Sequence, residues 1–253
     1  MKTAAEVADG YMTTGMNKAS LPAGRMFLSA MFAGAFIALG AVGSQIAGAV
    51  AGRLAGACVF PVGLVLVVSV GVELFTGNCL LFIPFLDKKI TLAAMLRNWG
   101  IVWLGNLTGS VLVALAACFG HVYGPIESAA GSLAPVIDTA GAKCSISIGN
   151  GLLRGILCNV LVCLAVWLAM SATDAAGKII GTCLPVMLFV LCGYEHSVAN
   201  MYFIPAGMLL SGDTGLFPGF LMNLIIVTLG NILGGAVIAG GGIYLLFVRP
   251  RRK

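Results

Sequence analysis

Two nearly uncharged stretches of this chain are too long to cross a membrane as straight helices. The first, residues 54–86, contains one charge, Glu73, and the second, residues 179–212, contains Glu195 and His196 near its middle. A straight helix over the 33 residues of the first stretch would be about 50 Å long, against a hydrocarbon core about 30 Å thick. Neither stretch is therefore expected to form one straight helix.

Proline and glycine lie close to the polar centre of both stretches. The first contains Pro61, Gly71 and Gly77, and the second contains Pro185 and Gly193. A helix break inside a bilayer exposes backbone groups that lipid cannot satisfy, so it is tolerated only where protein or a water-filled cavity surrounds it. The sequence predicts that both helices are broken and that both line a pathway.

The composition places the whole chain in a lipid bilayer. Hydrophobic residues make up 60% and charged residues 9%, whereas a soluble domain carries about 25% charged residues. This composition excludes a soluble catalytic domain. The chain has a net charge of +5, but its basic residues form no patch interleaved with aromatic residues, so no nucleic-acid partner is expected. We predict an all-α integral membrane protein with six transmembrane helices at about 26–48, 54–86, 98–119, 152–170, 179–211 and 216–248.

An internal repeat relates the two halves of the chain. Asn98–Asn106 and Asn223–Asn231 share six of nine residues at an offset of 125, and Glu73 precedes Glu195 by 122. Each half holds three spans, and an odd number inserts the two halves in opposite orientations, which is typical of transporters. The predicted division is an N-terminal amphipathic helix (1–25), a first repeat (26–125), an outer connecting segment (126–151), a second repeat (152–248) and a basic tail (249–253).

The basic residues predict the orientation. Three of them, Arg53, Lys143 and Arg154, fall in outer segments, and eleven fall in segments that are cytoplasmic if the N-terminus is inside. The excess of cytoplasmic basic residues predicts a multi-pass inner-membrane protein with both termini in the cytoplasm. Residues 3–20 either form an amphipathic helix along the inner surface or remain a frayed polar tail.

Ionisable residues within a span are functional candidates. For Glu73, Asn78, Glu195 and Asn200 we favour a scaffold role, in which each side chain accepts from or caps the backbone of its own broken helix. The eight cysteines are scattered without metal-ligand spacing, so they are interpreted as packing residues, and neither a metal site nor a cofactor is expected.

His196 differs from the scaffold candidates because its ring can exchange a proton. Burial disfavours the imidazolium, so the ring is expected to be neutral at rest and able to donate to an anion or pass a proton. A local partner that merely satisfies a buried histidine is the alternative. Thr76 falls at a similar depth in the first break, and we expect a Thr76–His196 hydrogen bond at the midplane.

The chain resembles the formate/nitrite transporter family in five stretches that cover nearly its whole length. These are FPVG at Phe60–Gly63, ELFTGN at Glu73–Asn78, NWGIVWLGN at Asn98–Asn106, ILCNVLVCLAVW at Ile156–Trp167 and GYEHSVANMYFIP at Gly193–Pro205. The resemblance implies an aquaporin-like outline, a homopentamer, no enzymatic activity, and transport of small monovalent anions of weak acids such as formate, nitrite or hydrosulfide.

The resemblance also implies roles for individual residues. It makes His196 and Thr76 the central pore pair and Lys143 the vestibule residue that attracts the anion. Asn159 joins the scaffold of the helix breaks. The outer constriction would consist of Phe60, Leu64 and Phe189, and the inner constriction of Leu74, Phe75 and Val162.

The expected mechanism starts with an anion that loses water between the apolar rings. Its basicity rises, so it takes a proton from His196 or from water hydrogen-bonded to it, and crosses as the neutral acid. A plain anion channel, in which His196 only donates a hydrogen bond, remains an alternative.

An aquaporin-like channel for neutral solutes would normally show Asn-Pro-Ala at both breaks, which this chain lacks. A membrane-embedded enzyme would have only Cys192 and Ser197 as nearby nucleophiles.

Overall fold

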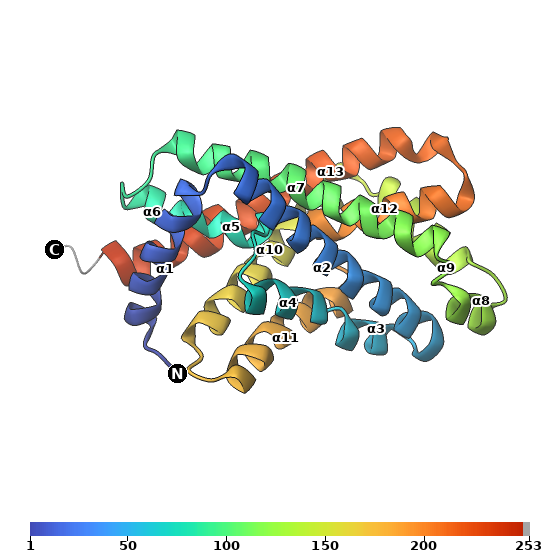
Figure 1. Ribbon diagram of the computed structural model, residues 1–253, viewed down its shortest axis with the longest axis horizontal. Coiled ribbons are helices and arrows are strands. Elements are labelled where there is room, and N and C mark those ends of the chain that lie inside the picture. Colours follow the sequence, from blue (N-terminus) through green and yellow to red (C-terminus); the bar gives the residue numbers. More distant parts are fainter. Residues whose placement is uncertain (250–253) are drawn as a thin grey trace.

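The computed structural model describes residues 1–249, and within that range the chain is helical, without strands. Residues 250–253 of the predicted basic tail lie outside the described residues. Helix α1 (Ala4–Ser20) precedes the spans, and it lies at one end of the molecule in Figure 1. Helices α8 (Gly124–Ala130) and α9 (Ala134–Cys144) lie at the other end.

Six helices are long and apolar enough to cross a membrane, which confirms the number of spans predicted from hydropathy. They are α2 (Ala23–Ala51), α3 with α4 (Arg53–Val59 and Val62–Val70), α7 (Leu92–Phe119), α10 (Ile148–Ser171), α11 (Ala175–Cys192) and the run from η2 to η4. That last run consists of η2 (Thr214–Leu216), α13 (Phe217–Ile232), η3 (Leu233–Gly240), α14 (Gly241–Ile243) and η4 (Tyr244–Val248).

The second and fifth spans are broken, as the proline and glycine positions predict. Helix α4 ends at Gly71 with φ of +79°, and α11 ends at Gly193 with φ of +70°. Left-handed backbone of this kind favours glycine, which has no Cβ to clash. After a few extended residues the chain becomes helical again, in α5 (Phe75–Asn78), η1 (Cys79–Leu81) and α6 (Phe82–Leu86), and in α12 (Ser197–Ser211).

Two small-residue faces let the long helices approach within this chain. A Cβ added to Gly109 of α7 would overlap the backbone carbonyl of Met31 in α2, and one added to Gly234 would overlap the carbonyl of Ile156 in α10. Such close contact lets extended helix surfaces pack without a gap. Helix α2 therefore packs closely against α7, and α10 packs closely against η3.

Candidate functional site

The two helix breaks meet at one buried hydrogen bond. Oγ1 of Thr76, in α5, lies 3.0 Å from Nε2 of His196, which immediately precedes α12. Thr76 is fully buried and His196 is 3% exposed. Two polar side chains from opposite halves of the chain thus face each other in the core of the protein.

The other ring nitrogen of His196 sets the position of its proton. Nδ1 accepts the backbone N–H of Ala199 at 3.0 Å and so caps α12. An atom that accepts from an N–H carries no proton of its own, so the neutral ring has its hydrogen on Nε2 and donates to Thr76. The ring of Phe189 stacks on the imidazole with centroids 5.8 Å apart, which fixes the plane of the ring.

A network of ion pairs and hydrogen bonds around the carboxylate of Glu73 lies beside the first break, and we call it a carboxylate circuit. Oε1 of Glu73 accepts from Nζ of Lys18, in α1, at 2.8 Å, and Oε2 accepts from Nδ2 of Asn78 at 2.7 Å. Asn78 Nδ2 also donates to Oδ1 of Asn98 at 2.9 Å, and Asn98 Nδ2 donates to the carbonyl of Lys18 at 3.1 Å. The circuit attaches α1 to the break.

A matching circuit lies beside the second break. Lys143 Nζ, in α9, lies 3.0 and 3.1 Å from the two carboxylate oxygens of Glu195, whose Oε2 also accepts from Asn200 Nδ2 at 2.7 Å. Asn200 donates to Asn223 at 2.8 Å, and Asn223 donates to the carbonyl of Lys143 at 2.8 Å. The Lys143 ammonium also lies over the ring of Phe203, 5.3 Å from its centroid.

The scaffold role of the two glutamates stays a prediction, but their contacts are not the backbone contacts expected from the sequence. Among the described residues, both carboxylates accept hydrogen bonds from lysine and asparagine side chains rather than from the backbone N–H groups of their own helices. Asparagines from facing helices hold those backbone groups instead. Asn106 accepts the N–H of Phe75 at 2.9 Å, and Asn231 accepts the N–H of Ser197 at 2.9 Å.

Each of these asparagines also donates across the break. Asn106 Nδ2 donates to the carbonyls of Ala30 at 2.7 Å and Glu73 at 3.0 Å. Asn231 Nδ2 donates to Gly155 at 2.8 Å and to Glu195 at 3.0 Å in the same pattern. Sequence reasoning assigned neither asparagine a role, although the nine-residue repeat that both of them close was the available signal.

Asn159 lies between the two breaks, in α10. Its Nδ2 donates to the carbonyl of Thr76 at 3.2 Å and to the carbonyl of Asn231 at 2.7 Å. A Cβ added to Gly235 would overlap this amide, so the glycine leaves the room that Asn159 occupies. Asn159 thereby connects the backbone of the first break to the helix that holds the second.

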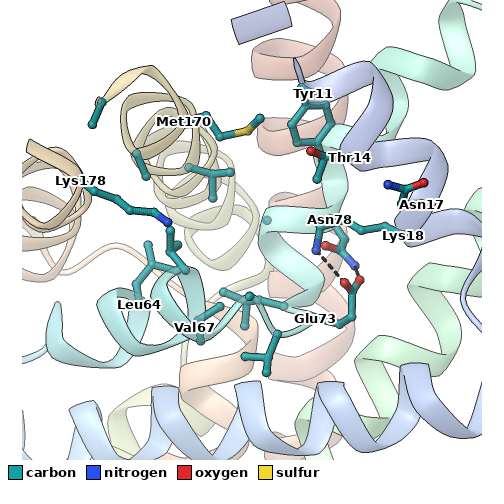
Figure 2. Close-up of a pocket in the computed structure, with 18 of the residues that line it drawn as sticks. Tyr11, Thr14, Asn17, Lys18, Leu64, Val67, Glu73, Asn78, Met170 and Lys178 are labelled. Carbon is teal, nitrogen blue, oxygen red and sulfur yellow. Dashed lines mark hydrogen bonds and ion pairs between the residues drawn. The ribbon is translucent and has the colours of Figure 1, made fainter. Parts of the chain in front are cut away.

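Two cavities approach the central pair from opposite ends, and they share no lining residue. The α1 cavity, about 710 Å³ and shown in Figure 2, is lined by residues of α1, α4 and α11 and by Glu73, Leu74 and Asn78. The α9 cavity, about 640 Å³, is lined by residues of α3 and α9 and by Glu195, His196 and Asn200. His196 is therefore reached from the α9 cavity.

The residues predicted to form the outer constriction are divided between the linings of the two cavities. Phe60 and Phe189 line the α9 cavity with ring centroids 5.7 Å apart. Leu64, expected beside them, instead lines the α1 cavity with Leu74. The assignment of Leu64 to the outer constriction stays a prediction.

Two other predicted constriction residues line neither cavity. Phe75 is 2% exposed and packs edge-on against Trp99, with centroids 6.4 Å apart. Val162, in α10, is 1% exposed. Both are buried in the core, and their place in the inner constriction stays a prediction.

Tyr11 of α1 is a further polar residue of the α1 cavity that sequence reasoning did not assign. It is 1% exposed, and its hydroxyl has no hydrogen-bond partner among the described residues. Burial raises the pKa of this phenol well above its ordinary value, so the hydroxyl remains protonated. Within residues 1–249, no cluster of His, Cys, Asp and Glu is placed to hold a metal ion.

The arrangement can bring a small polar solute to a hydrogen-bond donor enclosed by apolar walls. Six spans, two of them broken beside one buried polar pair, define a multi-pass membrane protein of the channel and transporter class. The chain belongs to the formate/nitrite transporter family, whose model matches residues 5–245. This is a family of channels and transporters, not of enzymes.

Individual relatives cover nearly the whole chain. An uncharacterized transporter of Bacillus subtilis, YrhG, is 41% identical over 243 residues, which are 93% of this chain and 90% of the relative. A probable formate transporter of Methanothermobacter thermautotrophicus is 40% identical over 93% of both chains. A solved pentameric formate channel with formate bound is 29% identical, with a TM-score of 0.76 over 89% of this chain and 98% of that chain.

Proposed function

We propose that this chain is a channel for small monovalent anions of weak acids, of which formate is the first candidate, and that the anion crosses together with a proton at His196. The probable formate transporter and the formate-bound channel among its relatives support the substrate class. Nitrite and hydrosulfide belong to the same class of small weak-acid anions.

The observation that carries the proposal is the hydrogen bond from His196 to Thr76 between two apolar walls. Phe60 and Phe189 stand on one side, and Leu64 and Leu74 on the other. An anion that leaves water at these walls loses its hydration, and apolar surroundings disfavour charge by several kcal/mol or more. Protonation removes that penalty because the neutral acid has little charge to solvate.

The geometry of His196 favours water as the immediate source of the proton. A neutral ring that gave up its only N–H proton would become an imidazolate, and Nδ1 is already occupied by the Ala199 N–H. We propose that the ring donates a hydrogen bond and orders water in the α9 cavity, and that this network passes a proton to the anion. The network is then reprotonated from one side.

Lys143 is the proposed attractor of the anion in the α9 cavity. The Lys143 ammonium is paired with the Glu195 carboxylate, but Arg53 and Arg154 also line the cavity. Three cations therefore face one carboxylate. A cavity with an excess of one sign of charge raises the local concentration of the opposite ion. Lys143 therefore acts together with the two arginines.

The proposed arrangement in the membrane is a homopentamer of inverted repeats. The pentameric relative supports the oligomer, and the two matching carboxylate circuits support the repeats. The excess of basic residues in the segments around α1 supports a cytoplasmic position for the α1 cavity and both termini, and an outer position for the α9 cavity.

Flux in proteoliposomes tests the function. Purified protein is reconstituted, and uptake of labelled formate, nitrite and hydrosulfide is compared with water and glycerol permeability. We expect anion flux that protein-free liposomes lack. Water or glycerol flux without flux of any of the three anions would overturn the proposal in favour of a neutral-solute channel.

A further inference from the structure

The α1 cavity contains a lysine whose charge is not neutralised by any carboxylate in the part of the chain that the structure describes. Lys178, in the first turns of α11, lines this cavity, and Figure 2 shows its side chain extending from the helix into the space opposite α1. Its side chain is half-buried, and among residues 1–249 it has neither an ion-pair partner nor a hydrogen-bond partner.

The other charged groups of the cavity are already engaged or exposed. Lys18 is bound to Glu73 at 2.8 Å. Asp174 caps α11, with Oδ1 accepting the N–H of Gly177 at 2.7 Å. Lys2 lines the cavity but lies on the exposed N-terminal segment. The cavity is thus lined by three lysines and two carboxylates, which leaves one positive charge in excess. Lys178 is the half-buried lysine that carries it.

The α9 cavity presents an equivalent cation at the same place. Arg53 opens α3, the first half of the other broken span, and lines the α9 cavity. It precedes Lys178 by 125 residues, the same offset that separates Lys18 from Lys143. In both cavities one lysine pairs with the carboxylate at the break, while a second cation on the broken helix is left without a carboxylate partner among the described residues.

We infer that Lys178 forms an anion-binding site in the α1 cavity for the same class of small carboxylate or oxyanion. This inference rests on the proposed function. An ammonium at the wall of a confined cavity with apolar surroundings attracts an anion more strongly than a solvated surface lysine does. The site raises the local concentration of the anion at the α1 end of the pathway. The cations of the α9 cavity do the same at the other end.

Flux measured separately from each face tests the site. Right-side-out and everted vesicles are made from a host without its own formate channel, and a protease-sensitive terminal tag reports which face is outside. Initial rates of labelled formate are measured against concentration. Lys178→Gln is expected to raise the half-saturation concentration from the α1 face by about threefold or more, with no change from the α9 face.

Three variants serve as matched controls. Arg53→Gln is expected to give the mirrored result, and Lys178→Arg should restore the wild-type value. Lys2→Gln removes the same charge from the same cavity and is expected to have less than half the effect of Lys178→Gln. High salt should reduce the difference between wild type and Lys178→Gln, because it screens the charge.

Several outcomes would overturn the inference. They are an unchanged half-saturation concentration from the α1 face, an equal rise from both faces, and an effect of Lys2→Gln as large as that of Lys178→Gln. If the wild-type chain moves no formate, the proposed function fails separately. Saturation-transfer NMR of formate with the solubilised protein then decides: a signal that Lys178→Gln weakens supports the site, and an unaltered signal contradicts it.

Discussion

The Nδ1 atom of His196 accepts the backbone N–H of Ala199 at 3.0 Å, so the residue at the centre of the molecule is also the N-cap of α12. Helix capping and proton placement are thereby coupled. While the cap persists, the neutral ring holds its single hydrogen at Nε2, directed at Thr76. Movement of α12 relative to the ring would be needed before Nδ1 could bind a proton.

Removal of the Thr76 hydroxyl should leave the imidazole N–H without its partner in the protein. We expect Thr76→Val to lower the free energy of unfolding by about 1–3 kcal/mol and to reduce formate flux, since a buried donor loses its acceptor. Thr76→Ser keeps a hydroxyl and should retain most of both. Thermal unfolding of the solubilised protein and proteoliposome flux provide the measurements. Equal stability and flux in Thr76→Val and wild type would show that the pair is dispensable.

Asn231 holds the second break through both ends of its side-chain amide. Asn231→Leu should lower the free energy of unfolding by at least about 2 kcal/mol, because the N–H of Ser197 and the carbonyl of Glu195 lose their partner. Leu229→Ala, on an exposed face of the same helix, is the control and should have a small effect. Thermal unfolding that ranks the control as the more damaging change would refute this role.

The close approach of α7 to α2 predicts a position-dependent response to alanine. Gly109→Ala would push a methyl group into the Met31 carbonyl and should destabilise the protein by about 1–3 kcal/mol. Gly100→Ala on the same helix meets no atom within 4 Å and should be tolerated. Melting temperatures and the yield of solubilised oligomer distinguish the two variants. Equal behaviour would mean that the helices can separate without penalty.

The structural role of Lys143 and its role in anion capture can be separated by also mutating its ion-pair partner, Glu195. Lys143→Gln leaves the buried Glu195 carboxylate without its cation and should cost about 3 kcal/mol of stability. Adding Glu195→Gln should recover stability. The double variant should still need more formate for half-saturation from the α9 face than Lys143→Arg does. A double variant with wild-type concentration dependence would remove Lys143 from anion capture.

The spans and breaks could be predicted because lipid imposes simple rules on length, charge and backbone satisfaction. The Thr76–His196 contact was predictable for a similar reason, since the repeat placed both residues at similar depth. The lysine partners were not predictable, because Lys18 lies 55 residues from Glu73 and Lys143 lies 52 residues from Glu195. Pairing over such distances depends on how α1 and α9 fold over the two cavities.

Proton movement with formate tests the proposed coupling at His196. Proteoliposomes containing a pH-sensitive dye receive labelled formate, and uptake is compared with the acidification of the lumen at a clamped membrane potential. We predict one proton for each formate in wild type and loss of this coupling in His196→Asn, whose side chain can still cap α12. Formate uptake that carries charge without acidification, or coupling that survives in His196→Asn, would contradict it.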